Sequence, residues 1–343
     1  MGKAVRFDAG EPAVSPRASE SARAETGQAM WSYLAQRLIL VVLVAFLVSI
    51  LIFVCLNFLP GSPVDAILGP NAPAEQRQEL IKAMNLDAPP VQRYLEWVGG
   101  IFRGDMGKSI HSREEVSTLI KQRFPATLEL GLLSLILSLS ISLPIGIYSG
   151  IRRGSVGDVL GTAFAMAAVS MPVFWTGILL ILFFSLKLGW FPASGYVPFV
   201  EDPLQNLKLM VLPAIAISTT STAMVMRQTR SGILEVLSQD YVRTAWAKGL
   251  RERTVVIRHA FRNAMIPVMT VLGFQVAMIF AGAVLVETIF AIPGMGRLLV
   301  DAIYSRDFVV VQSVALFVGI LVLLVNTVVD VSYAFIDPRI RLR

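Results

Sequence analysis

Long apolar runs alternate with polar segments along the chain, and six of the runs are long enough to cross a lipid bilayer. A membrane-spanning helix needs about 20 predominantly apolar residues. With 55% of its residues hydrophobic, the chain is too apolar for an ordinary soluble domain. The pattern therefore predicts an all-α integral membrane protein with six transmembrane helices. The runs cover about residues 38–59, 128–151, 159–188, 209–226, 264–289 and 309–335.

The third run contains Met171-Pro172 near its middle. Proline has no backbone N–H, and its ring displaces the preceding turn of a helix. We therefore expect the third helix to be kinked at this position.

The polar segments divide the chain further. Residues 1–30 are rich in Ala, Ser, Glu and Arg, so we expect a disordered cytoplasmic tail in front of a membrane domain at 31–343. A secretory signal is the competing interpretation, but its charged and apolar regions would both be too long. Residues 60–124 form a long polar loop whose basic and acidic residues nearly balance.

Charge around the short loops sets the expected orientation. Loop 227–263 has a clear excess of Lys and Arg, and Arg152-Arg153 and the arginines after residue 337 lie on the same side of the predicted helices. Loops rich in Lys and Arg stay in the cytoplasm. Both termini and loop 227–263 are therefore expected in the cytoplasm, and loop 60–124 outside. The net charge of +6 comes from these membrane-flanking residues, so it does not indicate nucleic-acid binding.

The most informative polar stretch is residues 240–267, DYVRTAWAKGLRERTVVIRHAFRNAMIP. Asp240 is a plausible N-cap for a short helix from Tyr241, and Gly249 falls where such a helix would end in a left-handed residue. The stretch resembles the EAA loop of permease subunits in binding-protein-dependent ABC importers. Arg243 stands where the general motif has Glu, and Pro267 lies further from Gly249 than the motif places it. Both features are similar to the dipeptide, oligopeptide and nickel branch.

Strings in the two external segments are also similar to that branch. In the long loop they include Arg93-Tyr94 and Gly104-Asp105-Met106-Gly107. The segment before the sixth run has Pro293-Gly294-Met295-Gly296-Arg297. The resemblance covers about residues 32–341.

The resemblance implies a type I ABC importer permease fold in the cytoplasmic (inner) membrane, with loop 227–263 coupling the chain to ATPase subunits. It also implies three kinds of protein partner: a second permease, two ATPase subunits and an extracytoplasmic binding protein. The implied cargo is di- or oligopeptides, with nickel or glutathione as minor options. The residues expected at the ATPase are Asp240, Tyr241, Arg243, Thr244, Ala245, Lys248 and Gly249.

Catalytic and cofactor motifs are missing from the sequence. The chain has two histidines and one cysteine, and it lacks the His-Glu-x-x-His and Gly-x-Ser-x-Gly patterns. Gly107-Lys108-Ser109 resembles the end of a phosphate-binding loop, but Phe102 stands where that loop needs its first glycine. We therefore expect no catalytic residue, no cofactor and no metal site.

Polar residues inside the spans are uncharged, and this decides between classes of transporter. Ser218, Ser221 and Gln275 are candidates for the lining of a passage. Ser134, Ser138 and Ser142 share one helix stripe, for which helix packing is the favoured interpretation. The charged residues lie near span ends, where solvation at the membrane interface would explain them: Glu129, Lys187, Arg227, Glu287 and Asp330.

Two alternatives from other classes remain to be weighed. An ion-coupled secondary transporter or channel would place charges inside its spans, and an intramembrane hydrolase would need a nucleophile and a base. The sequence favours neither.

Overall fold

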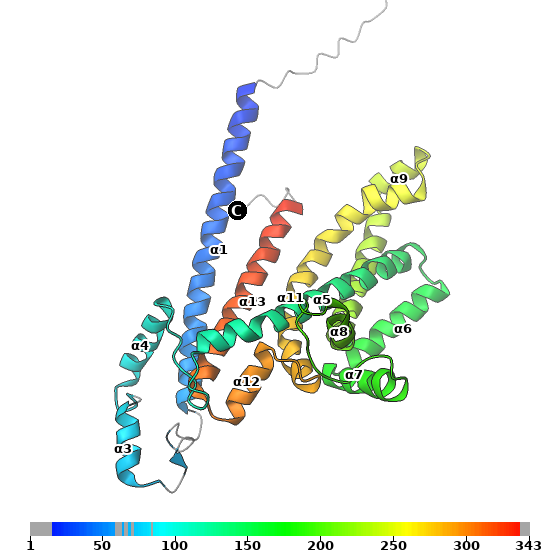
Figure 1. Ribbon diagram of the computed structural model, residues 1–343. Helices are drawn as coiled ribbons and strands as arrows, with labels where there is room; N and C mark the ends of the chain where they lie inside the picture. Colours follow the sequence, from blue (N-terminus) through cyan, green and yellow to red (C-terminus); the bar gives the residue numbers. More distant parts are fainter. Residues whose placement is uncertain (1–15, 59–63, 65–67, 70–71, 84, 337–343) are drawn as a thin grey trace, which may run out of the picture.

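The computed structural model describes residues 16–58, 64, 68–69, 72–83 and 85–336, and this part of the chain is helical without a β-strand. The helices in chain order (Figure 1) are α1 (Pro16–Phe58), α3 (Ala74–Ala83), α4 (Pro90–Phe102), α5 (Val116–Ile151), α6 (Val156–Ser170), α7 (Val173–Leu180), the π-helix η1 (Ile181–Lys187), α8 (Pro203–Leu237), α9 (Asp240–Ala247), α10 (Glu252–Thr254), the π-helix η2 (Val255–Phe261), α11 (Arg262–Ile289), α12 (Met295–Tyr304) and α13 (Phe308–Ile336).

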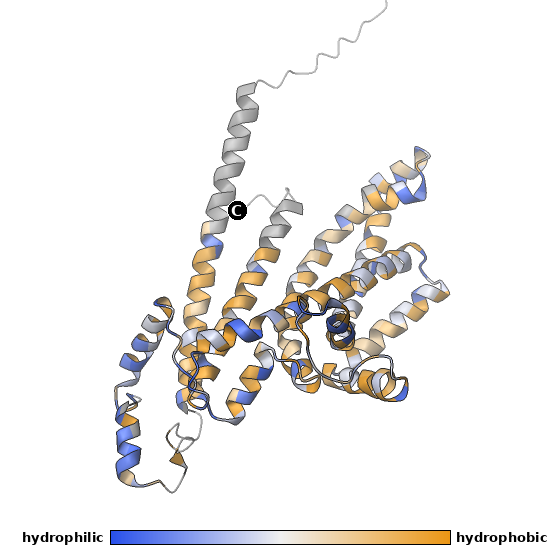
Figure 2. Cartoon of the chain, viewed as in Figure 1, coloured by the Kyte–Doolittle hydropathy of each residue, from blue (hydrophilic) through white to orange (hydrophobic). Residues whose placement is uncertain are grey.

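Five single helices are long and apolar enough to cross a membrane. They are Ala35–Asn57, Val116–Ile151, Pro203–Leu237, Asn263–Ile289 and Phe308–Val329. Figure 2 shows hydrophobic residues along these helices and hydrophilic ones over much of α3. Five of the six predicted runs are therefore single helices of the expected type.

The third run differs from the prediction, because it is two helices and not one kinked helix. α6 and the α7–η1 segment meet at an angle of 108°, so the total is six only if this bent pair counts as one span. Met171 (φ −92°, ψ 125°) and Pro172 (φ −61°, ψ 140°) both have extended backbone. A residue before proline is disfavoured in the helical region. Two successive extended residues therefore break the helix, where one proline alone would have bent it.

The ends of the predicted tail and loop also shift. α1 begins at Pro16, inside the tail expected at 1–30, and residues 1–15 lie outside the described part. The loop expected at 60–124 contains α3 and α4, and its last residues already belong to α5. In Figure 1 α9, the start of α1 and the end of α13 lie towards one side, and α3, α4 and α12 towards the other.

α8 is the most buried of the five single spans. α5 packs closely against it through two glycines. A Cβ at Gly146 would lie 2.7 Å from Cβ of Thr229, and one at Gly150 would lie 2.6 Å from Cγ2 of Ile233. Small residues at such contacts are the usual means of packing helices in a bilayer. α8 therefore forms the centre of the helical body, and its last turn leads directly into α9.

Candidate functional site

α9 is the short helix predicted from the sequence, but its N-cap is one residue earlier than expected. Gln239 has extended backbone and is the N-cap, whereas Asp240 is already the first helical residue and caps nothing. Asp240 instead accepts an exposed contact from Arg243, with Nη1 3.4 Å from Oδ1. Gly249 follows the helix with φ +76°, the left-handed conformation that the sequence predicts.

One face of α9 packs on its own chain. Val242 and Ala245 are buried and form a small apolar cluster with Val255 of η2, and Val236 and Leu237 at the end of α8 pack against it. Ala245, which was expected to contact a partner, therefore lies on the packed side and contributes to the seating of α9. Because only Ser238 and Gln239 separate α8 from α9, the two helices are joined both by the chain and by this cluster.

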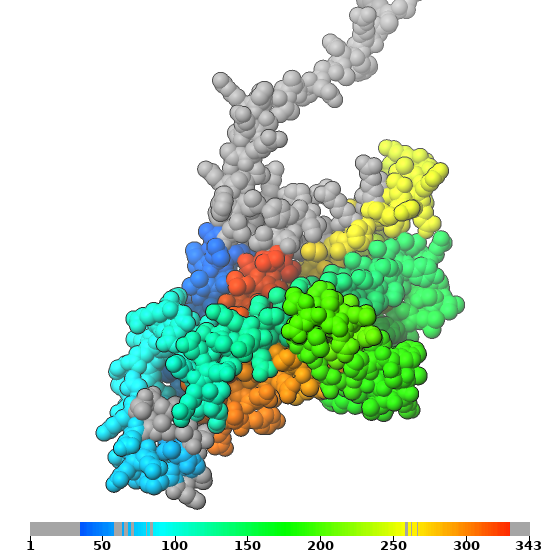
Figure 3. Space-filling model, in the orientation of Figure 1, coloured from blue at the N-terminus to red at the C-terminus, as the bar shows by residue number. Residues whose placement is uncertain are grey.

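The opposite face of α9 is exposed to solvent and carries both charged and aromatic side chains. Asp240, Arg243, Thr244 and Lys248 are exposed, and Tyr241 and Trp246 each leave over 40% of their surface exposed. Figure 3 shows this segment, in yellow, projecting from the rest of the molecule. Exposed aromatic side chains beside charged ones are typical of protein interfaces. The sequence also indicates Trp246 as apolar contact area in this stretch, and the side chain is exposed on the same surface.

Two hydrogen bonds order parts of this segment. Asn263 Nδ2 donates to Tyr241 Oη at 2.8 Å, which ties α9 to the start of α11. Thr244 Oγ1 donates to the Asp240 carbonyl at 3.0 Å. Gly249 has open space on its Cβ side: apart from its two neighbours along the chain, no heavy atom of the described residues comes within 4 Å.

The candidate passage residues Ser218, Ser221 and Gln275 are all buried within this chain. Ser138 of α5 donates to Ser221 of α8, with the two hydroxyl oxygens 3.2 Å apart. Ser218 Oγ donates to the carbonyl of Ile215. The first contact joins α5 to α8 and is consistent with the packing interpretation of the serine stripe, whereas the second lies within α8 itself.

Glu287 corrects the expectation that the charges near span ends are solvated. Its side chain is fully buried at the end of α11, where Oε1 accepts from Thr127 Oγ1 at 2.6 Å and Oε2 accepts from the Arg297 amide at 3.0 Å. A Cβ at Gly294 or Gly296 would overlap this carboxylate or approach it closely. The two glycines therefore let the N-terminus of α12 close over Glu287, and a helix N-terminus favours a negative charge.

The other four span-end charges differ among themselves. Lys187 and Arg227 are exposed, as expected. Glu129 is partly buried and accepts a hydrogen bond from Tyr196 Oη at 3.0 Å. Burial and this carboxylate raise the pKa of Tyr196 from 10 to about 12, so the phenol keeps its proton into more alkaline solution than usual. The side chain of Asp330 lies outside the described residues.

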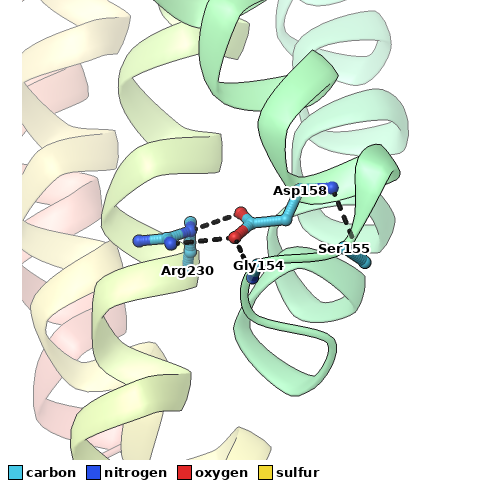
Figure 4. Close-up of polar contacts among 4 residues, drawn as sticks. All are labelled: Gly154, Ser155, Asp158 and Arg230. Atoms are coloured by element: carbon cyan, nitrogen blue, oxygen red, sulfur yellow. Dashed lines mark hydrogen bonds and ion pairs between the residues drawn. The ribbon is translucent and has the colours of Figure 1, made fainter.

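A second buried carboxylate, Asp158 at the start of α6, was missed by the sequence analysis. It pairs with Arg230 of α8, which the charge analysis counted only as one of many cytoplasmic arginines (Figure 4). The Ser155 hydroxyl caps the same helix by accepting from the Asp158 amide. The sequence Gly-Ser-x-x-Asp at a helix start predicts a helix cap. It does not predict that Asp158 pairs with Arg230, 72 residues further along the chain.

Two family models together match most of the chain. The first, "Binding-protein-dependent transport system inner membrane component", matches residues 142–342, and the model of the N-terminal part of such membrane components matches residues 30–131. The boundary between the two matches falls inside α5.

Curated relatives agree with this match, and a solved structure resembles the fold. The di/tripeptide transport system permease protein DppB of Pseudomonas aeruginosa (strain UCBPP-PA14) is 41% identical, over 91% of this chain and 99% of the relative. The dipeptide transport system permease protein DppB of Escherichia coli (strain K12) is 40% identical with the same coverage. A crystal structure of an amino acid ABC transporter with histidines matches 64% of this chain and 94% of its own chain, with a TM-score of 0.50 and 14% identity.

Proposed function

The chain belongs to the family of inner membrane components of binding-protein-dependent transport systems, and we propose that it forms part of the path through which an ABC importer moves di- or oligopeptides into the cell. The observation that carries this proposal is 40% identity to a dipeptide permease along nearly its whole length. Members of this family are multi-pass membrane permeases and not catalytic enzymes. The ion-coupled alternative is not favoured by any of the relatives.

The exposed face of α9 is the proposed contact with the ATPase. A binding-protein-dependent system requires a substrate-binding protein and an ATPase besides the permease. Asp240, Arg243 and Lys248 offer charges there, and Tyr241 and Trp246 offer apolar area. The exposure of Gly249 leaves room for a partner's backbone to approach. Thr244 is exposed on the same face, and Ala245 packs α9 against the rest of the chain.

The other subunits of the assembly are proposed from the same family membership. We propose a second, related permease beside this chain, two ATPase subunits below the pair, and a binding protein on the external side that carries α3, α4 and α12. Both termini and α9 would then lie in the cytoplasm. Ser218, Ser221 and Gln275 would contact the cargo only if the spans rearrange, because each is buried in this state.

Purification of the tagged chain from its native membrane, followed by mass spectrometry, tests the proposal. A permease of this class should bring with it an ATPase that carries a phosphate-binding loop, together with a second permease. A secondary transporter or channel should purify without either. Recovery of the intact chain in a folded, monodisperse form with no ATPase, under conditions that preserve such complexes, would argue against the proposed function.

A further inference from the structure

Asp158 and Arg230 form a two-pronged ion pair between α6 and α8 (Figure 4). Arg230 Nε lies 2.6 Å from Asp158 Oδ1, and Nη2 lies 3.0 Å from Oδ2. The Gly154 amide donates a third hydrogen bond to Oδ2 at 2.9 Å. Asp158 is only 3% exposed, so its carboxylate depends on these donors. Bidentate Arg–carboxylate pairs are among the strongest and most directional polar contacts in proteins.

The arginine of this pair lies on the helix that carries α9. Seven residues separate Arg230 from the end of α8 at Leu237, which is about two turns of helix. Val236 and Leu237 pack on the apolar cluster of α9. A displacement of α9 is therefore passed to α8 at the position of Arg230.

The aspartate lies in the first turn of α6, which follows α5 after the short loop 152–155. α6 runs from Val156 to Ser170 and ends at the break of 108° before α7. Beside the pair, α6 and α8 leave between them a cavity of about 500 Å³, lined mainly by apolar and small side chains. Such a gap allows the two helices to change their relative angle, because close-packed contacts resist that movement and an open space does not.

We propose that Asp158 and Arg230 are positioning residues that make α6 move together with α8 when the ATPase displaces α9. The proposal rests on the proposed function and adds the route by which movement reaches the broken span. The other contacts between the two helices here are apolar ones, of Ala165 and Ala168 with Ala223 and Met226, which can slide. The ion pair therefore supplies the directional link. The cytoplasmic end of α6 is thereby assigned the role of a gate element.

The main test measures peptide uptake per ATP hydrolysed, with the whole transporter reconstituted in vesicles. Arg230→Gln, Asp158→Asn and the double variant should each lower this ratio by about tenfold, within the range common for coupling between distant sites. ATP hydrolysis should continue. The double variant should be no worse than either single one, because both remove the same contact. A pair that only stabilises the fold would lower the yield and leave the ratio unchanged, which would overturn the proposal.

Arg152→Gln is the matched control. Arg152 also faces a carboxylate on the same side of the molecule, with Nη2 3.5 Å from Glu252 Oε2, but both side chains are largely exposed. An exposed pair contributes little. The ratio should therefore stay at the wild-type value. If the wild-type complex itself shows no ATP-driven uptake of peptide, the proposed function fails, and that result is separate from the outcome for Arg230.

A second measurement does not depend on the variants folding. In a chain with Cys55→Ser, spin labels at Leu160 of α6, Glu235 of α8 and Phe274 of α11 occupy exposed positions. On binding a non-hydrolysable ATP analogue, the 160–235 distance should stay constant and the 160–274 distance should change. A 160–235 distance that changes as much as the other, or a 160–274 distance that does not change, would overturn the proposal. Arg230→Lys keeps the charge but cannot form the bidentate contact with Asp158. In this variant the 160–235 distance should change on binding the ATP analogue.

Discussion

At the scale of single residues, the buried carboxylates Asp158 and Glu287 show where sequence reasoning stops. Each lies near the end of a predicted span, where a charged side chain is expected to be exposed to water. Their partners come from other helices: Arg230 for one, Thr127 and the start of α12 for the other. Gly249 could be predicted fully, because its left-handed backbone depends only on neighbours along the chain. Local conformation is readable from sequence, whereas a tertiary partner is not.

Gly249→Val should uncouple ATP hydrolysis from uptake while the chain still reaches the membrane at normal levels. A β-branched residue at φ +76° is strained by about 1–2 kcal/mol, and its side chain would project into the space proposed for the ATPase. The measurement is ATP-driven uptake in reconstituted vesicles. Gly104→Val is the matched control, because Gly104 has φ +82° and equally open surroundings in the loop proposed to be external. Normal uptake by Gly249→Val would exclude α9 as the coupling element.

Thr127→Val should destabilise the fold. The hydroxyl of Thr127 donates to Glu287 and accepts from the Met295 amide at 2.7 Å, so valine takes the donor from Oε1 of the buried Glu287 carboxylate and leaves the Met295 amide without this acceptor. Each such group costs about 1–3 kcal/mol. A thermal unfolding scan of the purified protein should show a clearly lower midpoint. Thr288→Val is the control, since Thr288 is exposed and only contacts its own helix; equal midpoints for the two variants would contradict the role given to Thr127.

At the scale of helices, the apolar runs predicted the type and approximate place of the long helices. The errors arose at prolines inside the runs and in the polar segments between them. Pro125 lies inside α5, which nevertheless begins at Val116, twelve residues before the predicted start. Pro172 instead divides its run, because Met171 is extended as well. A proline motif alone does not distinguish these outcomes, since the neighbouring helices supply the contacts that keep α5 continuous. α3 and α4 were missed because their short amphipathic patterns lie in a polar background.

The proposed topology makes a direct prediction for two loops. With Cys55→Ser as background, a cysteine replacing Ser194 should react with an impermeant thiol reagent in intact cells. A cysteine replacing Ser238, beside α9, should react only after the inner membrane is made permeable. Both positions are exposed, so access to the reagent depends on the side of the membrane alone. Labelling of position 238 from outside would reverse the orientation and remove α9 from the reach of a cytoplasmic ATPase.

At the scale of the whole molecule, the family could be predicted from one stretch of the sequence, because residues 240–267 resemble the EAA loop of such permeases. Family models and relatives confirm that identification over almost the full chain. The passage could not be predicted in the same way. Ser218, Ser221 and Gln275 are buried here, and a path shared with the proposed second permease would not be a property of either sequence alone.

Uptake by the complete transporter should need ATP and the binding protein, and it should not respond to ion gradients. Spans of a transporter driven by ions carry charged residues for coupling. The purified complex in vesicles can be assayed with and without ionophores that abolish proton and sodium gradients. Equal uptake in both conditions is the expected result. Loss of uptake on adding an ionophore, at constant internal ATP, would favour the ion-coupled alternative.

The break between α6 and α7 has a consequence for the lipid around the protein. α6 has 15 residues and is therefore about 22 Å long, which is less than the roughly 30 Å of hydrocarbon that a bilayer presents. After the turn of 108°, the next segment cannot complete the crossing along the same axis. It exposes Phe174, Trp175 and Phe183, side chains suited to the level of the headgroups. With α6 entering from the cytoplasm, as proposed, this corner lies in the outer half of the bilayer, where we expect the lipid to thin towards the bend.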